Sequence, residues 1–348
     1  MARIIWIALI AGGLTVCEET TAVENQEPQP PDGPSPAAGF VPLTELGTGT
    51  YLGFEGGLYP DGRNEPPSDH AAAGAARVAA IEPLDTAGRP DPAGRIVLLS
   101  VGMSSTSQVF CSGPVTDCAT FSFVGQAAAD PDVDHATVAI VDGAMRGRDA
   151  DKWDSPGIYD LVRNERLGPL GLTEAQVQVV WILQANRVPT VSLPSQAADA
   201  FELEANLGTI VRTLADHYPN LRLVFVSSRI YGGWATSAAN PEPYAYESGF
   251  AVKWLIEAQI VQTRTGRVDA ESGDLGLGTT PWLGWGPYTW AAGETPRADG
   301  LTWTRDDFAK GDGTHVSPSG REKVGRLLLD FFETSPFAAC WFRIDLTC

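Results

Sequence analysis

The clearest hydrophobic pattern in the chain is a run of four apolar residues, 96–99 (IVLL), within residues 95–108 (RIVLLSVGMSSTSQ). A cluster of chain breakers, residues 89–94 (RPDPAG), comes directly before it. A short uninterrupted apolar run bounded by breakers is typical of a strand that is buried on both faces of a parallel sheet. We therefore predict a core strand over residues 95–101, ended by Gly102 and followed by a cluster of hydroxyl residues.

The same kind of pattern recurs along the chain and alternates with helical spacing. Further core strands are predicted at 136–141 (ATVAIV), 177–183 (VQVVWIL) and 221–226 (LRLVFV). Helices are predicted at 70–81, 197–218, 246–263 and 317–332, the last with Ser317 as N-cap and Pro318 at its first position. Alternation of strands and helices predicts an α/β fold with a parallel sheet and crossover connections. No repeat or second domain is evident, so residues 40–348 are predicted to form one domain.

Two segments depart from this alternation. Residues 47–62 are rich in glycine with scattered aromatics and predict a small N-terminal hairpin layer. Residues 282–303 are rich in tryptophan, glycine and proline and predict an aromatic loop insertion near the sheet edge. Two interpretations of the loop stay open, a self-packed cover or a platform that stacks on sugar rings or an acyl group. The candidate substrate-binding residues under the second interpretation are Tyr231, Trp234, Trp285 and Trp290.

Composition and charge narrow the class of partner. The chain has 348 residues, of which 43% are hydrophobic, and this is enough material for a sizeable core. Its formal net charge of -19 would repel a nucleic acid or an anionic membrane surface. We therefore expect no nucleic-acid partner. The acidity by itself does not indicate a substrate.

The first residues predict export from a bacterial cell. Arg3 precedes a short apolar stretch, and residues 14–17 (LTVC) resemble a bacterial lipoprotein signal in which Cys17 is lipidated. Ordinary cleavage after Ala22 is the alternative. Residues 1–17 are thus predicted to be a signal peptide, and the acidic, proline-rich residues 18–39 a disordered tether. The expected location is periplasmic, anchored to the outer membrane, or extracellular.

The four cysteines that follow Cys17 form two pairs that are close in sequence. They are Cys111 with Cys118 and Cys340 with Cys348. Four cysteines allow three connectivities, and these pairings close the shortest loops. Metal binding is the alternative, but no histidine lies near either pair, and an export signal favours disulfides. We therefore predict disulfides Cys111–Cys118 and Cys340–Cys348.

The carboxyl ends of the predicted strands carry candidate chemistry. The first strand leads to Ser104, the second to a loop with Gly143 and Gly147, and the third to Asn186. Because parallel strands end at one edge of the sheet, these groups are expected to converge. A compact Asp-x-x-His arrangement, Asp312 and His315, lies far downstream. A serine with a histidine base, a carboxylate and preorganised hydrogen-bond donors is the set that acyl transfer needs.

These blocks resemble the SGNH hydrolases, also called GDSL-type lipases and esterases, in residue type and in chain order. The matching blocks are residues 102–105 (GMSS), 142–147 (DGAMRG), 184–186 (QAN) and 312–315 (DGTH). The resemblance implies a three-layer α/β/α fold with a mostly parallel, flavodoxin-like sheet. It implies Ser104 as nucleophile, His315 as general base and Asp312 as its partner. The Ser104 N–H, Gly147 (preferred over Gly143) and Asn186 would form the oxyanion hole.

The chain departs from the family pattern at several positions. Met103 and Ser105 flank the serine where aspartate and leucine are usual, and Ala185 and Arg187 flank the asparagine where glycine and aspartate are usual. This predicts a divergent branch whose substrate does not carry over. The chain lacks a Gly-x-Ser-x-Gly elbow, and its acid residue stands beside the histidine, which argues against an α/β-hydrolase fold.

The resulting hypothesis is a serine esterase that hydrolyses a carboxylic ester through an acyl-enzyme, with an O-acyl group on a carbohydrate as a candidate substrate. No cofactor or metal is expected, and the spacing of the histidines is not that of a zinc site. Arg146 or Arg148 would bind a substrate carboxylate or else face water. His70, His135 and His217 are interpreted as structural or surface residues. An acyltransferase on the same site and a non-catalytic carbohydrate-binding protein remain as alternatives.

Overall fold

The computed structural model describes residues 39–348. The predicted signal peptide, Cys17 and all but the last residue of the predicted tether lie outside the described residues. Five strands form one parallel sheet: β3 (Ile96–Gly102), β4 (Val138–Val141), β5 (Val177–Leu183), β6 (Leu223–Ser227) and β7 (Trp282–Trp285). Their spatial order is β4-β3-β5-β6-β7. Numbered along the chain this is 2-1-3-4-5, the order of flavodoxin-like folds, so the predicted fold class is confirmed.

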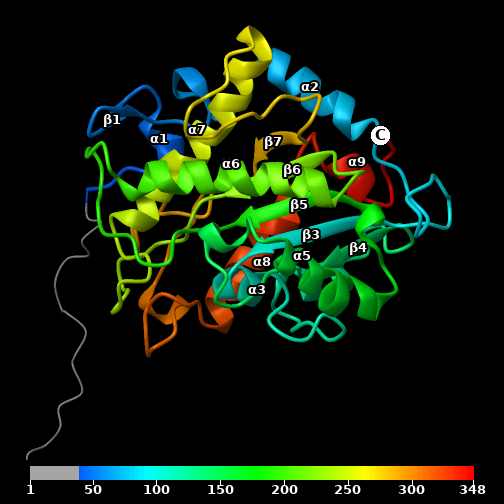
Figure 1. Ribbon diagram of the computed structural model, residues 1–348. Helices are drawn as coiled ribbons and strands as arrows, with labels where there is room; N and C mark the ends of the chain where they lie inside the picture. Colours follow the sequence, from blue (N-terminus) through cyan, green and yellow to red (C-terminus); the bar gives the residue numbers. More distant parts are fainter. Residues whose placement is uncertain (1–38) are drawn as a thin grey trace, which may run out of the picture. The chain divides into compact units, whose positions relative to one another are not determined.

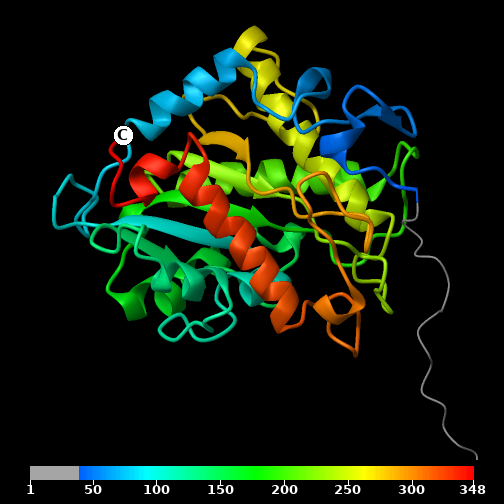
Figure 2. The same ribbon diagram turned by 180° about the vertical axis from the view of Figure 1, so that it is seen from behind.

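The sheet is central because its strands are apolar throughout. All seven residues of β3, all seven of β5 and all five of β6 are buried. Helix α6 (Asp199–His217) crosses in front of the sheet in Figure 1, whereas α8 (Pro318–Thr334) crosses in front of it in the reverse view of Figure 2. Helix α7 (Tyr244–Thr265) packs on α6, and α3 (Ser104–Phe110) and α4 (Phe123–Ala129) pack on α8. The result is the predicted arrangement of helices on both faces of one sheet.

The helices that the periodicity predicts are present with small changes at their ends. They are α2 (Ser68–Val78), α6, α7 and α8. Ser317 is the N-cap of α8, as predicted, and its hydroxyl accepts a hydrogen bond from the Gly320 N–H. The remaining α-helices of residues 39–348 are short: α1 (Leu43–Leu46), α5 (Pro156–Val162) and α9 (Ala339–Phe342). None of the helices within residues 39–348 is long and apolar enough to cross a membrane.

The two segments that depart from the alternation of strands and helices, residues 47–62 and 282–303, differ in how well their structure matches the prediction. The predicted hairpin layer is present as the antiparallel pair β1 (Thr50–Tyr51) and β2 (Phe54–Glu55). The predicted aromatic loop begins instead with β7, the fifth strand of the main sheet, which pairs with β6. Strand β7 is only four residues long and is flanked by Pro281 and Gly286. It is therefore too short to show the alternation of apolar and polar residues by which a strand is recognised in sequence.

Both predicted disulfides are present. Cys111 is bonded to Cys118 just after α3, and Cys340 in α9 is bonded to Cys348 at the end of the chain. The first disulfide closes the loop that follows the helix carrying Ser104. It therefore restrains the segment that follows α3 in sequence, close to the candidate nucleophile.

Candidate active site

The first functional group, Ser104, lies at the first position of α3, immediately beyond the carboxyl end of β3. Gly102 makes the turn between them close: a Cβ there would lie 2.1 Å from Thr106 Oγ1 and 2.4 Å from the Leu183 carbonyl oxygen. Glycine is thus required because the strand end packs directly against the helix and the neighbouring strand. This local geometry presents Ser104 at the edge of the sheet.

The buried carboxylate of Asp142 holds helix α3 in place through a hydrogen bond from Ser107. Asp142, at the end of β4, accepts hydrogen bonds from Ser100 Oγ (2.7 Å), Ser107 Oγ (2.6 Å) and the Ala144 N–H (3.1 Å). Burial raises the pKa of Asp142 against the opposing effect of these donors. The side chain therefore ties together β3, α3 and the glycine loop that follows β4.

His315 reaches Ser104 from the opposite end of the chain. Its Nε2 lies 2.9 Å from Ser104 Oγ, and its Nδ1 lies 2.6 Å from Asp312 Oδ2. Asp312 Oδ1 accepts hydrogen bonds from the backbone N–H groups of Thr314 (2.9 Å) and His315 (3.0 Å). The three side chains thus form one continuous hydrogen-bonded series, the geometry of a serine–histidine–aspartate triad.

The carboxylate of this series is held in its charged form. Burial alone would raise the pKa of Asp312, but hydrogen bonds from the His315 ring, the His315 N–H and the Thr314 N–H outweigh it and lower the pKa. An ionised Asp312 keeps the proton of the neutral imidazole on Nδ1. Nε2 is then free to accept the proton of Ser104.

The Asp-x-x-His turn needs glycine at its second position. Gly313 has φ +61°, and a Cβ there would lie 1.8 Å from the carbonyl oxygen of Trp234. The neighbouring Asp312 carbonyl accepts a hydrogen bond from the Thr236 N–H at 2.9 Å. The loop after β6 therefore packs against the turn that carries the histidine and is hydrogen-bonded to it.

Ser104 and His315 open onto a cavity of about 220 Å³ at the carboxyl edge of the sheet. Its lining combines the serine and histidine with glycine, asparagine, acidic and basic residues. The lining residues are Met103, Ser104, Ser105, Gly147, Asp149, Arg187, Arg229, Ala239, Asn240, Thr314 and His315.

Two backbone N–H groups at this cavity are available as donors. Ser104 stands at a helix N-terminus, where N–H groups lack intrahelical partners. Gly147 has φ +72°, and its N–H makes no backbone hydrogen bond within residues 39–348. A Cβ at Gly147 would meet no atom within 4 Å, and the residue lies on the cavity lining.

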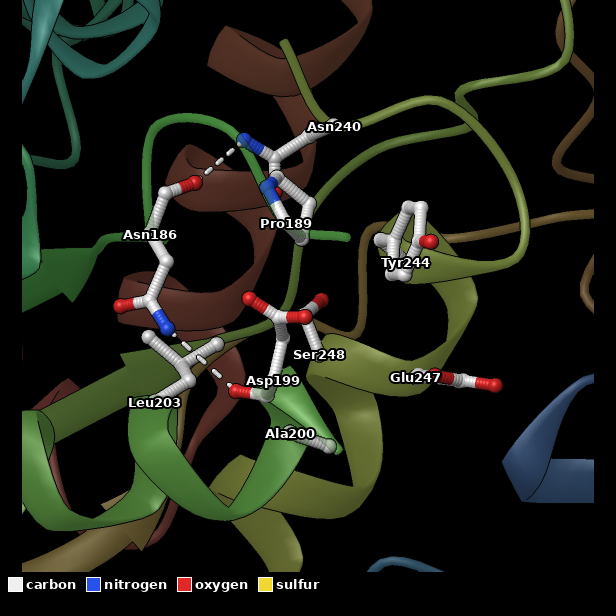
Figure 3. Close-up of a pocket in the computed structure, with 9 residues that line it drawn as sticks. All are labelled: Asn186, Pro189, Asp199, Ala200, Leu203, Asn240, Tyr244, Glu247 and Ser248. Carbon is white, nitrogen blue, oxygen red and sulfur yellow. Dashed lines mark hydrogen bonds between the residues drawn. The ribbon is translucent and has the colours of Figure 1, made fainter. Parts of the chain in front are cut away.

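The third predicted donor, Asn186, does not face the serine. Its Nδ2 donates to the Asp199 carbonyl oxygen at 3.3 Å, and its Oδ1 accepts from Asn206 Nδ2 at 3.0 Å. Figure 3 shows the amide turned toward Asp199, while Asn240 donates to the Asn186 carbonyl oxygen at 2.7 Å. Because α6 supplies partners for both ends of the amide, the side chain is turned away from the cavity, and Asn240 takes the adjoining place in its lining.

The four predicted aromatic binding residues also lie outside the serine cavity, three of them in the hydrophobic core and Trp234 partly buried against it. Tyr231 and Trp290 are 1% and 0% exposed, and Trp290 Nε1 donates to Glu242. Trp285 belongs to β7 and its Nε1 donates to the Leu58 carbonyl oxygen. Trp234 is half-buried against Tyr231, with ring centroids 4.7 Å apart. None of the four lines the serine cavity, so the structure favours the self-packed interpretation of this segment.

Of the two roles left open for Arg146 and Arg148, the structure favours the one in which both side chains face water. Arg146 and Arg148 are exposed and do not line the cavity, whereas Arg187 and Arg229 do. Arg229 follows the end of β6 by two residues, so the strand-end rule that identifies Ser104 also points to it. Within residues 39–348, no group of three or more histidine, cysteine or acidic side chains is placed to hold a metal ion.

Comparison with known proteins finds similarity in structure only. No family model matches the chain, and no curated protein matches it in sequence. The esterase EstA from Pseudoalteromonas aligns over 68% of this chain and 97% of its own, with 8% identity and a TM-score of 0.35. A mutant of an acetyl-xylooligosaccharide esterase from Geobacillus aligns over 70% and 95%, with 13% identity and a TM-score of 0.39. TesA aligns over 69% and 99%, with 14% identity and a TM-score of 0.31. The assignment of the site rests on its own geometry.

Proposed function

We propose that this chain is an ester hydrolase of SGNH type in which Ser104 is the nucleophile. The observation that carries the proposal is the hydrogen-bonded series from Ser104 Oγ through His315 to Asp312, at 2.9 and 2.6 Å. The neighbouring hydroxyl of Ser105 is in a different environment, since it accepts a hydrogen bond from Arg229 Nη1, and this supports Ser104 over Ser105 as the nucleophile.

In the proposed reaction, Ser104 Oγ attacks the ester carbonyl carbon while His315 Nε2 takes the hydroxyl proton. The resulting oxyanion receives hydrogen bonds from the N–H groups of Ser104 and Gly147. The intermediate collapses as His315 donates its proton to the departing alcohol, which leaves an acyl group on Ser104. Water then attacks this acyl-enzyme, gives its proton to His315, and the acid departs as Ser104 regains its proton. Asp312 orients the imidazole and stabilises its charged form throughout.

Hydrolysis of 4-nitrophenyl acetate tests this proposal. The wild-type protein is expected to release 4-nitrophenol, and Ser104→Ala to lose at least about 1,000-fold in kcat/KM. Ser105→Ala keeps the Ser104–His315 pair and is expected to retain turnover. If Ser104→Ala turns over like the wild type while Ser105→Ala is inactive, the nucleophile has been assigned one residue too early.

The substrate class and the acceptor of the acyl group each have a test of their own. Release of acetate from an acetylated xylo-oligosaccharide tests whether a carbohydrate O-acyl group is accepted. Product analysis with added sugar acceptors separates hydrolysis from acyl transfer on the same site, since transfer would yield an acylated sugar in place of free acid.

We also propose that the chain is exported. The two disulfides support this proposal, because disulfides persist in oxidising compartments. Mass spectrometry of the mature N-terminus tests it: lipidated Cys17 supports an anchored form, and an N-terminus after Ala22 supports a secreted one. An intact Met1 on protein from the cytoplasm would contradict export.

A further inference from the structure

Arg229 places a buried positive charge beside the candidate nucleophile. The residue follows β6, is 3% exposed, and lines the same cavity as Ser104 and His315. Its Nη1 donates to Ser105 Oγ at 2.5 Å. Within residues 39–348 this is the only hydrogen bond of the guanidinium group, and its Nε is buried without a partner.

Arg229 has no direct ion-pair partner within the described residues. No carboxylate oxygen there lies within 4.0 Å of its nitrogens. The acid that acts on it, Glu242, is itself occupied by hydrogen bonds from the Gly232 N–H (2.9 Å), the Tyr246 N–H (3.0 Å) and Trp290 Nε1 (2.8 Å). Burial raises the pKa of Glu242 against the opposing effect of these three hydrogen bonds. Burial lowers the pKa of Arg229 to about 10, so the guanidinium stays charged at neutral pH.

An unpaired buried charge is costly, because a protein interior does not replace the water that would solvate it. Such a charge is explained when it faces a cavity that an anionic ligand enters. A second arginine, Arg187, lies on the same lining, is exposed, and has no ion-pair partner within residues 39–348. Against these two guanidinium groups the lining carries one carboxylate, that of Asp149. The lining thus carries more guanidinium groups than carboxylates in a chain whose net charge is -19.

We propose that the substrate is an ester that carries a carboxylate, which Arg229 binds at the base of the cavity and Arg187 at its rim. This inference rests on the proposed esterase function and names the substrate class of that site. A planar guanidinium matches a carboxylate through two parallel hydrogen bonds, which fixes orientation as well as affinity. Binding of the carboxylate would hold the ester carbonyl over Ser104.

A different role for Arg229 makes a different prediction. Since Asn186 is turned away, the guanidinium could instead donate to the oxyanion. An oxyanion donor accelerates every ester alike, whereas a carboxylate receptor favours only esters that carry the carboxylate. The ratio of kcat/KM between a carboxylate-bearing ester and its neutral counterpart therefore separates the two roles.

The experiment measures that ratio for the intact protein with two matched pairs of substrates. 4-Acetoxybenzoate and its methyl ester place the carboxylate on the alcohol side. The mono-4-nitrophenyl ester of terephthalic acid and its methyl ester place it on the acyl side. For at least one pair the ratio is expected to fall about tenfold or more in Arg229→Gln, relative to the wild type. Arg229→Lys keeps the charge but loses the planar fork and is expected to fall between the two.

Two further variants keep the test interpretable if Arg229→Gln fails to fold. Arg187→Gln changes an exposed residue and is expected to lower the ratio about threefold or more. Arg146→Gln removes an equal charge from an exposed arginine outside the cavity and is expected to change the ratio less than twofold. Comparing each variant with the wild type cancels differences in the intrinsic reactivity of the esters.

The outcomes are distinct for the two proposals. If the wild type hydrolyses neutral esters but the ratio is the same in all variants for both pairs, the carboxylate receptor is wrong and the esterase stands. An equal loss on both members of each pair in Arg229→Gln would assign Arg229 to the oxyanion instead. Preference for 4-acetoxyphenyl phosphate over 4-acetoxybenzoate would overturn the choice of carboxylate. If the folded wild type hydrolyses none of these esters, the proposed function itself fails.

Discussion

Ser104 Oγ and His315 Nε2 lie 2.9 Å apart although 211 residues separate them in the chain. Two features of the fold produce this contact. The buried strand β3 delivers Ser104 to the carboxyl edge of the sheet, and the segment before α8 brings His315 back to the same edge. Helices α3 and α8 pack on each other, so the two residues are joined at the starts of neighbouring helices.

Asp312→Asn tests the role of the carboxylate. Asparagine would present an amide donor to His315 Nδ1, which now donates to Asp312 Oδ2 at 2.6 Å. The imidazole would then favour the wrong tautomer, with its proton directed at Ser104. We expect kcat for ester hydrolysis to fall by about 100- to 10,000-fold with the fold retained, as measured by steady-state kinetics and circular dichroism. Asp306→Asn, an exposed position nearby, is the matched control, and an equal loss in both variants would contradict the role.

Gly313→Ala tests the turn that carries the histidine. The new Cβ would lie 1.8 Å from the Trp234 carbonyl oxygen, and φ at this position is +61°. The turn must therefore move, which shifts His315 away from Ser104. We expect a loss of stability of at least about 1–3 kcal/mol in denaturant unfolding and a fall in kcat of about tenfold or more.

Gly311→Ala is the matched control for that substitution. Gly311 lies two residues away, and a Cβ there meets no atom within 4 Å. It is expected to change stability by less than about 0.5 kcal/mol and to leave turnover within twofold. Equal behaviour of the two variants would show that the close packing at Gly313 does not position the histidine.

A buried carboxyl group predicts how stability depends on pH. Burial raises the pKa of Glu247 from 4.5 to about 7, and the nearby acids Glu242 and Asp199 add to the rise. The folded state therefore holds this proton more tightly than the unfolded state, so the contribution to stability is present below pH 4.5 and is lost as pH rises through about 7.

Glu247→Gln removes that dependence. Glutamine can still accept the hydrogen bonds that the carboxylate receives from the Leu193 N–H and the Tyr51 hydroxyl, both at 3.1 Å. We compare the free energy of unfolding in urea of the variant with that of the wild type at each pH. The difference is expected to be more favourable to the variant at pH 8 than at pH 5, by on the order of 1–3 kcal/mol. Glu202→Gln, at an exposed position, is the control and should show no such difference. A pH-independent effect of Glu247→Gln would contradict the raised pKa.

Sequence analysis succeeds where a pattern has a local physical cause. The continuous apolar runs predict β3, β5 and β6 because a strand buried on both faces admits no polar alternation. The Asp-x-x-His pair is recognisable because its hydrogen bonds close within four residues. The end of a buried strand points to the hydroxyl cluster at residues 104–107, since parallel strands end at one edge, and the resemblance to the SGNH hydrolases selects Ser104 within it.

The parts that sequence analysis missed depend on contacts between distant segments. Asn186 is turned away because Asp199 and Asn206, on α6, supply its hydrogen bonds, and no local pattern specifies that choice. Trp285 is hidden in a strand too short to show a period. The sequence places Arg229 just after a strand end, but only the folded chain shows that its guanidinium group is buried at the cavity.

Labelling with a fluorophosphonate probe tests the central claim most directly, because the probe reacts with a serine only where a base activates it. Peptide mapping by mass spectrometry of the labelled, folded protein is predicted to find one adduct, on Ser104, and His315→Ala is predicted to lose it. A folded wild-type protein that takes up no probe, or that carries the adduct on a serine remote from His315, would contradict the assignment of Ser104 as the nucleophile.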